Sequence, residues 1–293
     1  KIGLDEEGGI ISTEILATRV RVRRSHYEEA DRVLREGGSA VLAGLSRIAK
    51  LRKARRQAEG AVEIDIPEVR AHVREGVIRI DAVPETESSG LVRELMLLAG
   101  EAAARWAFER GLAFPFYGQE APSDPGPEAQ GDSLSAQFAR RRLMRAGISG
   151  PTPTAHRGLG LPFYAQATSP LRRYQDLLGH MQIRAVLSGR PPLPADEVQR
   201  RCALAQAGQA ATRTAERASD LHWALAWLLR EPGWEGEGVI VGLSGPACQV
   251  YLPALGLETR LKLGPGRELD ERLRLKVARI DLPALSSSFD EIV

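Results

Sequence analysis

The pattern of apolar and polar positions divides the chain into strand-forming segments near both ends and helices between them. Apolar residues alternate with polar ones in residues 61–83, which predicts paired strands. Residues 1–24 predict a strand, a turn and a second strand. Residues 235–293 predict short strands joined by glycine turns, as in a small β-barrel. Helical spacing predicts helices at about residues 25–38, 39–60, 88–111, 170–187 and 196–230.

End signals delimit the first of these helices, and an apolar face supports the second. Ser25, with Glu28 three residues later, forms a capping box, and Gly37 ends the helix. One face of the second helix is apolar and is formed by Leu42, Leu45, Ile48 and Ala49. We expect the basic run from Arg47 to Arg56 to form the solvated face of this helix. A role in binding nucleic acid is the alternative.

The helix at residues 88–111 is mostly apolar and is predicted to begin at a cap near Ser88 or Ser89. Its position in the chain predicts burial between the sheet and other helices. Glu94 and Glu101 are then unusual, because a carboxylate on a buried helix is rarely left unpaired.

The segments without periodicity set the domain boundaries. Residues 118–135 are rich in Pro, Gly, Ser and acidic residues and predict a loop. Residues 231–236, EPGWEG, predict a linker after the last long helix. The order of elements indicates an α+β fold with two domains. Residues 1–230 would form a mixed sheet packed with helices, and residues 235–293 would form the barrel.

Composition adds few constraints. The chain has 293 residues, 43% of them hydrophobic and 27% charged, and no apolar run reaches the roughly 20 residues of a membrane span. Cys202 and Cys248 lack metal-ligand spacing, so we expect a cytoplasmic protein that does not bind membranes. The net charge of +2 does not by itself indicate a nucleic-acid partner. Because the chain opens at Lys1 with a strand already under way, we expect it to be part of a longer protein.

The basic residues are mostly arginine, and two of them occupy an unusual position. Ser169 is a natural N-cap and Pro170 suits the first helical position, which puts Arg172 and Arg173 in the first turn. The helix dipole disfavours cations there by roughly 0.3–1 kcal/mol. An anion such as phosphate would compensate, since backbone N–H groups and guanidinium groups both bind it. The predicted buried face is formed by Leu171, Tyr174, Leu178 and Met181.

The alternative is an ion pair with a carboxylate. Arg172 would then pair with Asp176 one turn later. His180, one further turn along the same helix face, would extend this row of paired side chains.

At this point the residues resemble a known family. The stretch HRGLGLPFYAQATSPLRRYQDLLGH, residues 156–180, closely resembles the signature of the ribonuclease II / ribonuclease R (RNB) family. RSHYEEAD, LVRELMLLA and TAERASDLHW resemble other helices of the family more weakly, and residues 235–293 resemble its C-terminal OB-type barrel. The resemblance implies a hydrolytic 3′-to-5′ exoribonuclease that uses Mg²⁺ and releases nucleoside 5′-monophosphates. It also implies that this chain acts as a monomer on single-stranded RNA with a free 3′ end.

The resemblance implies roles for individual residues. Arg172 would grip the scissile or an adjacent phosphate, Tyr27 would lie beside the terminal nucleotide, and Glu94 would contact the ribose 2′-hydroxyl region. Glu216 would help to position the RNA end. The remaining residues of the 3′-end channel would be Tyr164, Thr168, Ser169 and Arg173.

Each role has a structural alternative. Tyr27 could be an ordinary aromatic residue at a helix start, Glu94 a buried ion-pair partner and Glu216 a surface charge. Arg173 could be structural, as could Tyr174. We expect His156 and His180 to be structural rather than acid–base groups.

The chain departs from the family in ways that bear on function. The family's metal site is an aspartate cluster in a D-P-x-x-x-x-x-D-D motif, and this sequence has none. We therefore expect the Mg²⁺ ligands to lie upstream of Lys1. No aromatic residue stands near Ile64, where the family's best-known members stack a base. In the barrel, Tyr251 is the candidate for base stacking, with the core as an equal alternative. Basic residues alternate along two strands and would bind the RNA backbone, or form a solvated face: Arg260, Lys262, Arg272, Arg274 and Lys276.

Two hypotheses follow. The first is an exoribonuclease whose metal-binding segment lies outside this chain. The second is an RNA-binding regulator of the same fold that has lost catalysis. The presence of Tyr27, Glu94 and Arg172 together favours the first.

Overall fold

The computed structural model describes residues 1–123, 126 and 129–292, and these divide into two compact units. The first unit comprises residues 1–62, 85–122 and 145–209, and the second comprises residues 63–84, 123–144 and 210–293. The division falls within the longest helix rather than at the linker after residue 230. Part of the predicted loop at 118–135 lies outside the described residues.

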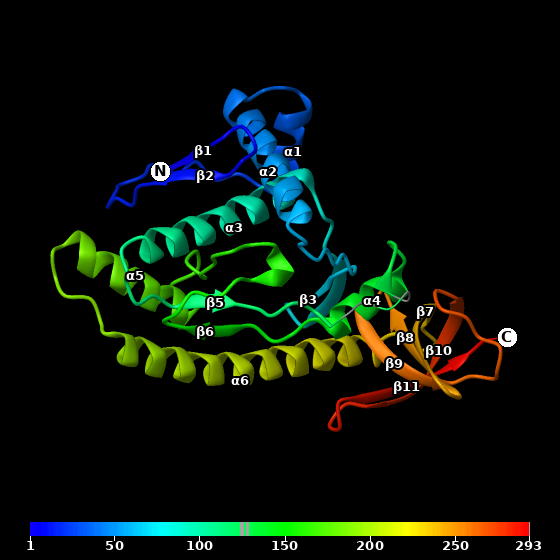
Figure 1. Ribbon diagram of the computed structural model, residues 1–293. Coiled ribbons are helices and arrows are strands. Elements are labelled where there is room, and N and C mark those ends of the chain that lie inside the picture. The colour runs from blue at the N-terminus through cyan, green and yellow to red at the C-terminus, as the bar shows by residue number, and fades with distance from the viewer. Residues whose placement is uncertain (124–125, 127–128, 293) are drawn as a thin grey trace. The chain divides into compact units, whose positions relative to one another are not determined.

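The first unit contains two small antiparallel sheets and most of the helices (Figure 1). Its apolar core gathers on α3, whose buried residues include Ala104 and Trp106, and on Phe114 and Phe116 after it. Its strands are β1 (Ile2–Leu4), β2 (Ile10–Thr13), β5 (Phe116–Gly118) and β6 (Ile148–Gly150). Its helices are α1 (Tyr27–Arg35), α2 (Ala40–Ala58), α3 (Glu87–Phe108), α5 (Tyr174–Leu187) and the first part of α6 (Ala195–Leu228).

The second unit is built on a five-stranded antiparallel sheet with strand order β11-β10-β7-β8-β9. Its edge strands, β9 and β11, contact each other, which makes the sheet barrel-like. Apolar residues that alternate along the strands fill the interior, among them Ile240, Val250 and Leu275. The barrel strands are β7 (Glu235–Ser244), β8 (Ala247–Leu252), β9 (Leu257–Lys262), β10 (Arg272–Asp281) and β11 (Ser286–Glu291). The unit also contains the hairpin β3 (Val69–Arg74) and β4 (Val77–Ala82), helix α4 (Leu134–Leu143) and the end of α6.

These elements confirm the α+β fold with a small OB-type barrel at its C-terminal end. The hairpin in residues 1–24 is also confirmed, although β2 ends at Thr13. Of residues 61–83, only the stretch from Val69 onward forms strands, as β3 and β4. No helix in the described part of the chain is long and apolar enough to cross a membrane.

Helix starts were predicted with mixed success. Ser39 caps α2 by accepting a hydrogen bond from a backbone N–H, as its type favours. The capping box at Ser25 is wrong, because its hydroxyl donates to the Glu29 carboxylate at 2.8 Å and His26 occupies the cap position. The cap of α3 is Thr86, two residues before the predicted one.

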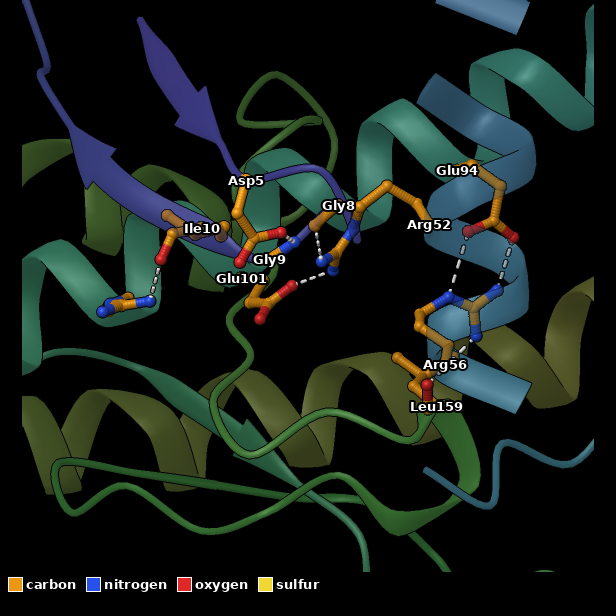
Figure 2. Close-up of polar contacts among 10 residues, drawn as sticks. Asp5, Gly8, Gly9, Ile10, Arg52, Arg56, Glu94, Glu101 and Leu159 are labelled. Atoms are coloured by element: carbon orange, nitrogen blue, oxygen red, sulfur yellow. Dashed lines mark hydrogen bonds and ion pairs between the residues drawn. The ribbon is translucent and has the colours of Figure 1, made fainter. Parts of the chain in front are cut away.

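Two arginines continue the buried stripe of α2. Arg52 is 1% exposed and Arg56 is 8% exposed, so the prediction of a solvated basic face is wrong for both. The Arg52 guanidinium forms an ion pair with Glu101 of α3 and donates to the Gly8 carbonyl oxygen at 2.7 Å (Figure 2). Burial raises the pKa of the Glu101 carboxyl, an effect that the Arg52 guanidinium opposes. These contacts join α2, α3 and the turn between β1 and β2.

His156 is buried and begins the motif at residues 156–180, just before the glycine-rich segment RGLG at residues 157–160. Its ring packs between Tyr117 and Tyr164, with ring centroids 5.6 Å away in each case. Its backbone N–H donates to the Leu161 carbonyl oxygen at 2.8 Å. Burial lowers the pKa of His156 to about 4, so the imidazole is neutral in the folded protein near pH 7. The structural role expected for this histidine is thus supported.

Replacing Glu101 by Gln should destabilise the fold by about 3–5 kcal/mol, because Arg52 would keep its buried charge without a carboxylate. Urea unfolding followed by circular dichroism measures this loss. The matched control is Glu85→Gln, which removes an exposed ion pair with Arg93 and should cost less than about 1 kcal/mol. Equal losses in the two variants would contradict the assignment.

Folding stability should fall as the pH is lowered from about 6.5 to 4, because the unfolded chain protonates its histidine in this range and folded His156 does not. The part due to His156 should approach about 3 kcal/mol at pH 4. His156→Phe keeps an aromatic ring and removes the titration. The difference between the unfolding free energies of the wild type and this variant should therefore depend on pH over this range. A constant difference would be evidence against a buried neutral imidazole.

Candidate functional site

The turn before α5 carries the predicted phosphate-binding residues. α5 begins at Tyr174 with Arg173 as its N-cap residue, so the prediction of a helix start at Ser169 is wrong. Residues 169–173 form a turn in which the Arg172 and Arg173 backbone N–H groups donate to the Ser169 carbonyl oxygen at 3.2 and 3.0 Å. Arg172 therefore precedes the helix, and the dipole penalty expected for it does not arise.

The shifted start also rotates the helix relative to the prediction. Leu171 is fully exposed, and Tyr174 and Met181 are 42% and 38% exposed, so the predicted buried face is wrong apart from Leu178. The residues that α5 buries are Gln175, Asp176, Leu178, Gly179, Gln182 and Ile183. Much of this face is polar, which is why apolar spacing did not reveal it.

Asp176 holds the turn in place from the first turn of α5. Its Oδ2 accepts from the Ser169 backbone N–H at 2.7 Å and from the Arg173 guanidinium at 2.8 Å. The Asp176 side chain is fully buried, and a carboxylate at this end of a helix is favoured by the dipole. The ion-pair alternative thus applies to Arg173 rather than to Arg172. His180 does not extend the row, since its Nε2 hydrogen-bonds the Ala167 carbonyl oxygen at 2.8 Å.

Arg172 differs from its neighbour. It is exposed, and its side chain makes no hydrogen bond or ion pair with the described residues. Because Asp176 holds the turn in place, the exposed Arg172 guanidinium is available to an external anion.

Tyr164 lies beside this turn and packs against α3. A Cβ atom at Gly100 would collide with the Tyr164 ring, so glycine is required for this close approach. Burial raises the pKa of Tyr164, and the charges of Arg173, Asp176 and Arg56 also act on it. The Tyr164 hydroxyl thus lies in a buried setting within the field of these three charges. Of the other two predicted channel residues, Thr168 is exposed and Ser169 is half-buried.

Glu94 is held by a buried ion pair. The Arg56 guanidinium contacts both of its carboxylate oxygens, with Nε donating to Oε2 at 3.0 Å, and also donates to the Leu159 carbonyl oxygen at 3.0 Å (Figure 2). Gly160 has φ +63° and lies against the Arg56 carbonyl oxygen, where a Cβ atom would collide. Glu94 is 3% exposed, which supports the buried ion-pair alternative.

Tyr27 begins α1 and is 48% exposed. Its carbonyl oxygen accepts from the Ser88 hydroxyl at 3.1 Å, and Asp31 accepts from the Ser88 backbone N–H at 2.8 Å. Tyr27 is thereby anchored at the start of α3, and Glu94 lies six residues further along that helix. Six residues of an α-helix rise about 9 Å and rotate about 240° around the helix axis. Ser88, which anchors Tyr27, and Glu94 therefore point to different sides of α3.

The remaining predicted residues belong to the second unit. Glu216 is exposed on α6, and Lys262 is exposed on β9. Arg274 forms an exposed ion pair with Glu235 at 2.7 Å. Tyr251 is 3% exposed, packs against Phe138 and donates its hydroxyl to the Pro67 carbonyl oxygen, so the prediction that it stacks on RNA bases is wrong.

Sequence reasoning missed the partners of the acidic residues on α3. The signal was present, because Arg52 and Arg56 follow Leu45 and Ala49 at helical spacing on the same face of α2. Among the described residues, no group of three or more His, Cys, Asp or Glu side chains could hold a metal ion.

Comparison with known proteins agrees with the motif. The chain matches the RNB domain model over residues 1–189. An uncharacterized ribonuclease of Synechocystis sp. is 34% identical over 305 residues, which cover 96% of this chain and 44% of that protein. The chloroplastic/mitochondrial ribonuclease II of Arabidopsis thaliana is 27% identical over 268 residues, which cover 86% of this chain and 33% of that protein. The chain thus spans less than half the length of these relatives.

Solved structures show the same fold. RNase R of Mycoplasma genitalium aligns with a TM-score of 0.83 in its apo form and 0.82 in complex with ribose-methylated single-stranded RNA. Each alignment covers 99% of this chain and 57% of that one at 16% identity. With the motif at residues 156–180, these matches show that the chain belongs to the RNB domain family, with ribonuclease II and ribonuclease R among its relatives.

Proposed function

We propose that this chain provides the RNA-gripping part of a hydrolytic 3′-to-5′ exoribonuclease that releases nucleoside 5′-monophosphates from single-stranded RNA. The observation that carries the proposal is the turn at residues 169–173. The Arg172 guanidinium is exposed on this turn, and the buried Asp176 carboxylate holds the turn in place. The relatives named ribonucleases, and the RNase R complex with single-stranded RNA, support the same activity.

The chemistry of the site residues fits this role. A guanidinium can donate two parallel hydrogen bonds to a phosphate, and it stabilises the charge that develops when the phosphodiester is attacked. The half-exposed ring of Tyr27 offers a face for stacking on a base, a contact that does not depend on sequence. The Glu94 carboxylate is bound to Arg56, which also binds the Leu159 carbonyl oxygen of the glycine-rich segment. We therefore propose that Glu94 affects RNA indirectly, by positioning Arg56 and this segment.

The magnesium ion is proposed to bind outside the residues described here. Because no cluster of ligands is present among them, we derive no step of the reaction through the metal. The relatives are more than twice as long as the matched region, and we propose that the ligands lie upstream of Lys1 in a longer protein. We further propose that this protein is cytoplasmic, for which the two free cysteines, Cys202 and Cys248, give support. We also propose that it acts as a monomer.

A second candidate is an RNA-binding regulator without catalysis. The two functions differ in turnover: 3′-labelled RNA incubated with the longer protein and Mg²⁺ should yield mononucleotides only under the first proposal.

Arg172→Ala in the longer protein should lower kcat by about 10²–10³-fold, because a phosphate contact that strengthens during hydrolysis is lost. Binding of a long RNA should change much less, since most phosphate contacts remain. Single-turnover degradation and filter binding measure the two effects. Arg190→Ala, another exposed arginine of the first unit, is the control and should alter neither more than about twofold. Equal losses of turnover and binding would make Arg172 a general binding residue.

Asp176→Asn should lower both stability and turnover, by contrast with Arg172→Ala. Loss of the charge leaves partly buried Arg173 without its carboxylate and should cost about 3 kcal/mol. Arg172→Ala, at an exposed position, should change the unfolding free energy by less than about 0.5 kcal/mol. Thermal unfolding of the two variants tests this contrast. A large loss of stability in Arg172→Ala would show that its side chain is structural.

A further inference from the structure

A cavity of about 420 Å³ lies within the second unit, between α4 and the outer face of the barrel. One wall is the face of α4 that carries Ser135, Ala139 and Arg142, at positions i, i+4 and i+7. The opposite wall comes from β7, β8 and β9, and Figure 1 shows α4 beside these strands. The volume falls in the range of small-molecule sites.

Contacts on either side of the cavity hold its walls together. Asp270 accepts from the Ser135 backbone N–H at 2.8 Å and from its hydroxyl at 2.6 Å. On the next turn of α4, Phe138 packs against Tyr251, with ring centroids 5.1 Å apart. Arg141 forms an ion pair with Glu258 of β9. The cavity is therefore preformed rather than a gap between loosely associated parts.

Two arginines, Arg142 and Arg260, line this cavity beside Gln249. The Arg142 guanidinium donates to Gln249 Oε1 at 3.0 Å and to the Val241 carbonyl oxygen at 3.2 Å, both neutral acceptors. Arg260 pairs with Gln249 across the β8–β9 ladder, so the two side chains lie on the same face of the sheet. Among the described residues, Arg260 has no hydrogen-bond or ion-pair partner.

The guanidinium groups of Arg142 and Arg260 form no ion pair among the described residues, while the nearby Glu258 carboxylate pairs with Arg141 and accepts from Gln249 Nε2 at 2.5 Å. Other arginines of the barrel differ in this respect. Arg267, Arg272 and Arg274 each form an ion pair with a glutamate. The two guanidinium groups favour an anion, and phosphate matches their donor geometry.

The rest of the lining is apolar or small. Val241 and Cys248 are buried beneath the cavity, and Leu243 is half-exposed at its edge. The register of β7 and β8 shifts between Ile240 and Gly242, and Gly242 leaves space next to Gln249 and Arg142. An apolar surface of this kind suits a planar ring rather than a chain of charged groups.

We propose that this cavity binds a nucleoside 5′-monophosphate, with the phosphate between Arg142 and Arg260 and the base against the apolar surface. The physiological source of the ligand rests on the proposed function, since this is the product class of that reaction. Binding itself does not depend on catalysis. The site would let the released product bind the second unit, whereas Arg172 belongs to the first.

The test is calorimetric titration of the chain with AMP, UMP, adenosine and inorganic phosphate. AMP and UMP should bind at one site, and adenosine and phosphate should each bind at least about tenfold more weakly, because each lacks one part of the ligand. Arg142→Gln and Arg260→Gln should each weaken AMP binding roughly tenfold or more, as expected for a charged hydrogen bond. Gly242→Leu should abolish binding by filling the cavity. Circular dichroism confirms that each variant is folded, and Arg142→Lys separates loss of charge from loss of the planar group.

Two controls make the result specific. Arg274→Gln, on the same barrel but paired with Glu235, should leave AMP affinity unchanged. Arg172→Ala should also leave it unchanged, even where that substitution abolishes turnover in the longer protein, so failure of the two proposals can be told apart. The proposal is overturned by no AMP binding, by affinity insensitive to Arg142 and Arg260, or by binding lost with Arg172. It is also overturned if phosphate alone binds as tightly as AMP, or if an RNA oligomer binds the cavity and AMP cannot displace it.

Discussion

Buried guanidinium–carboxylate pairs between α2 and α3 are the constraint on which the first unit depends. Glu94 and Glu101 are seven residues apart and share one face of α3, while Arg52 and Arg56 share one face of α2. A buried charge without a partner is costly, so only one register of the two helices satisfies both pairs. Each arginine also donates to a carbonyl oxygen of another segment, and this register thereby positions the β1–β2 turn and Leu159.

The same arrangement of charge recurs where the chain is proposed to meet RNA. Asp176 is buried and binds Arg173 and the Ser169 backbone, which leaves adjacent Arg172 exposed. Two neighbouring arginines thus have opposite roles, one holding the turn and one facing outward. Tyr164 packs against Gly100 of α3, where a Cβ atom would collide with its ring, and this places it close to the α2–α3 interface.

The outer face of the barrel is not a uniformly basic surface. α4 covers part of β7 and β8, and Tyr251 belongs to that contact rather than to solvent. The cations that alternate along β10 lie beside acids of β7, which neutralise Arg272 and Arg274. Arg142 and Arg260, which line the cavity, form no ion pair among the described residues. Charge pairing, rather than the number of arginines, thus distinguishes the regions of this unit that can attract an anion.

The sequence by itself determined the local elements: the hairpin, the long helices, the barrel and the family motif, because period, cap residues such as Ser39 and turn glycines act over a few neighbouring residues. It also identified Glu94 as a carboxylate that needs a partner. Only the tertiary structure decided which charges are buried and paired. Arg56 lies 38 residues from Glu94, and Arg52 lies 49 residues from Glu101. The free energy of a buried charge depends on such distant partners and on desolvation, neither of which local periodicity encodes.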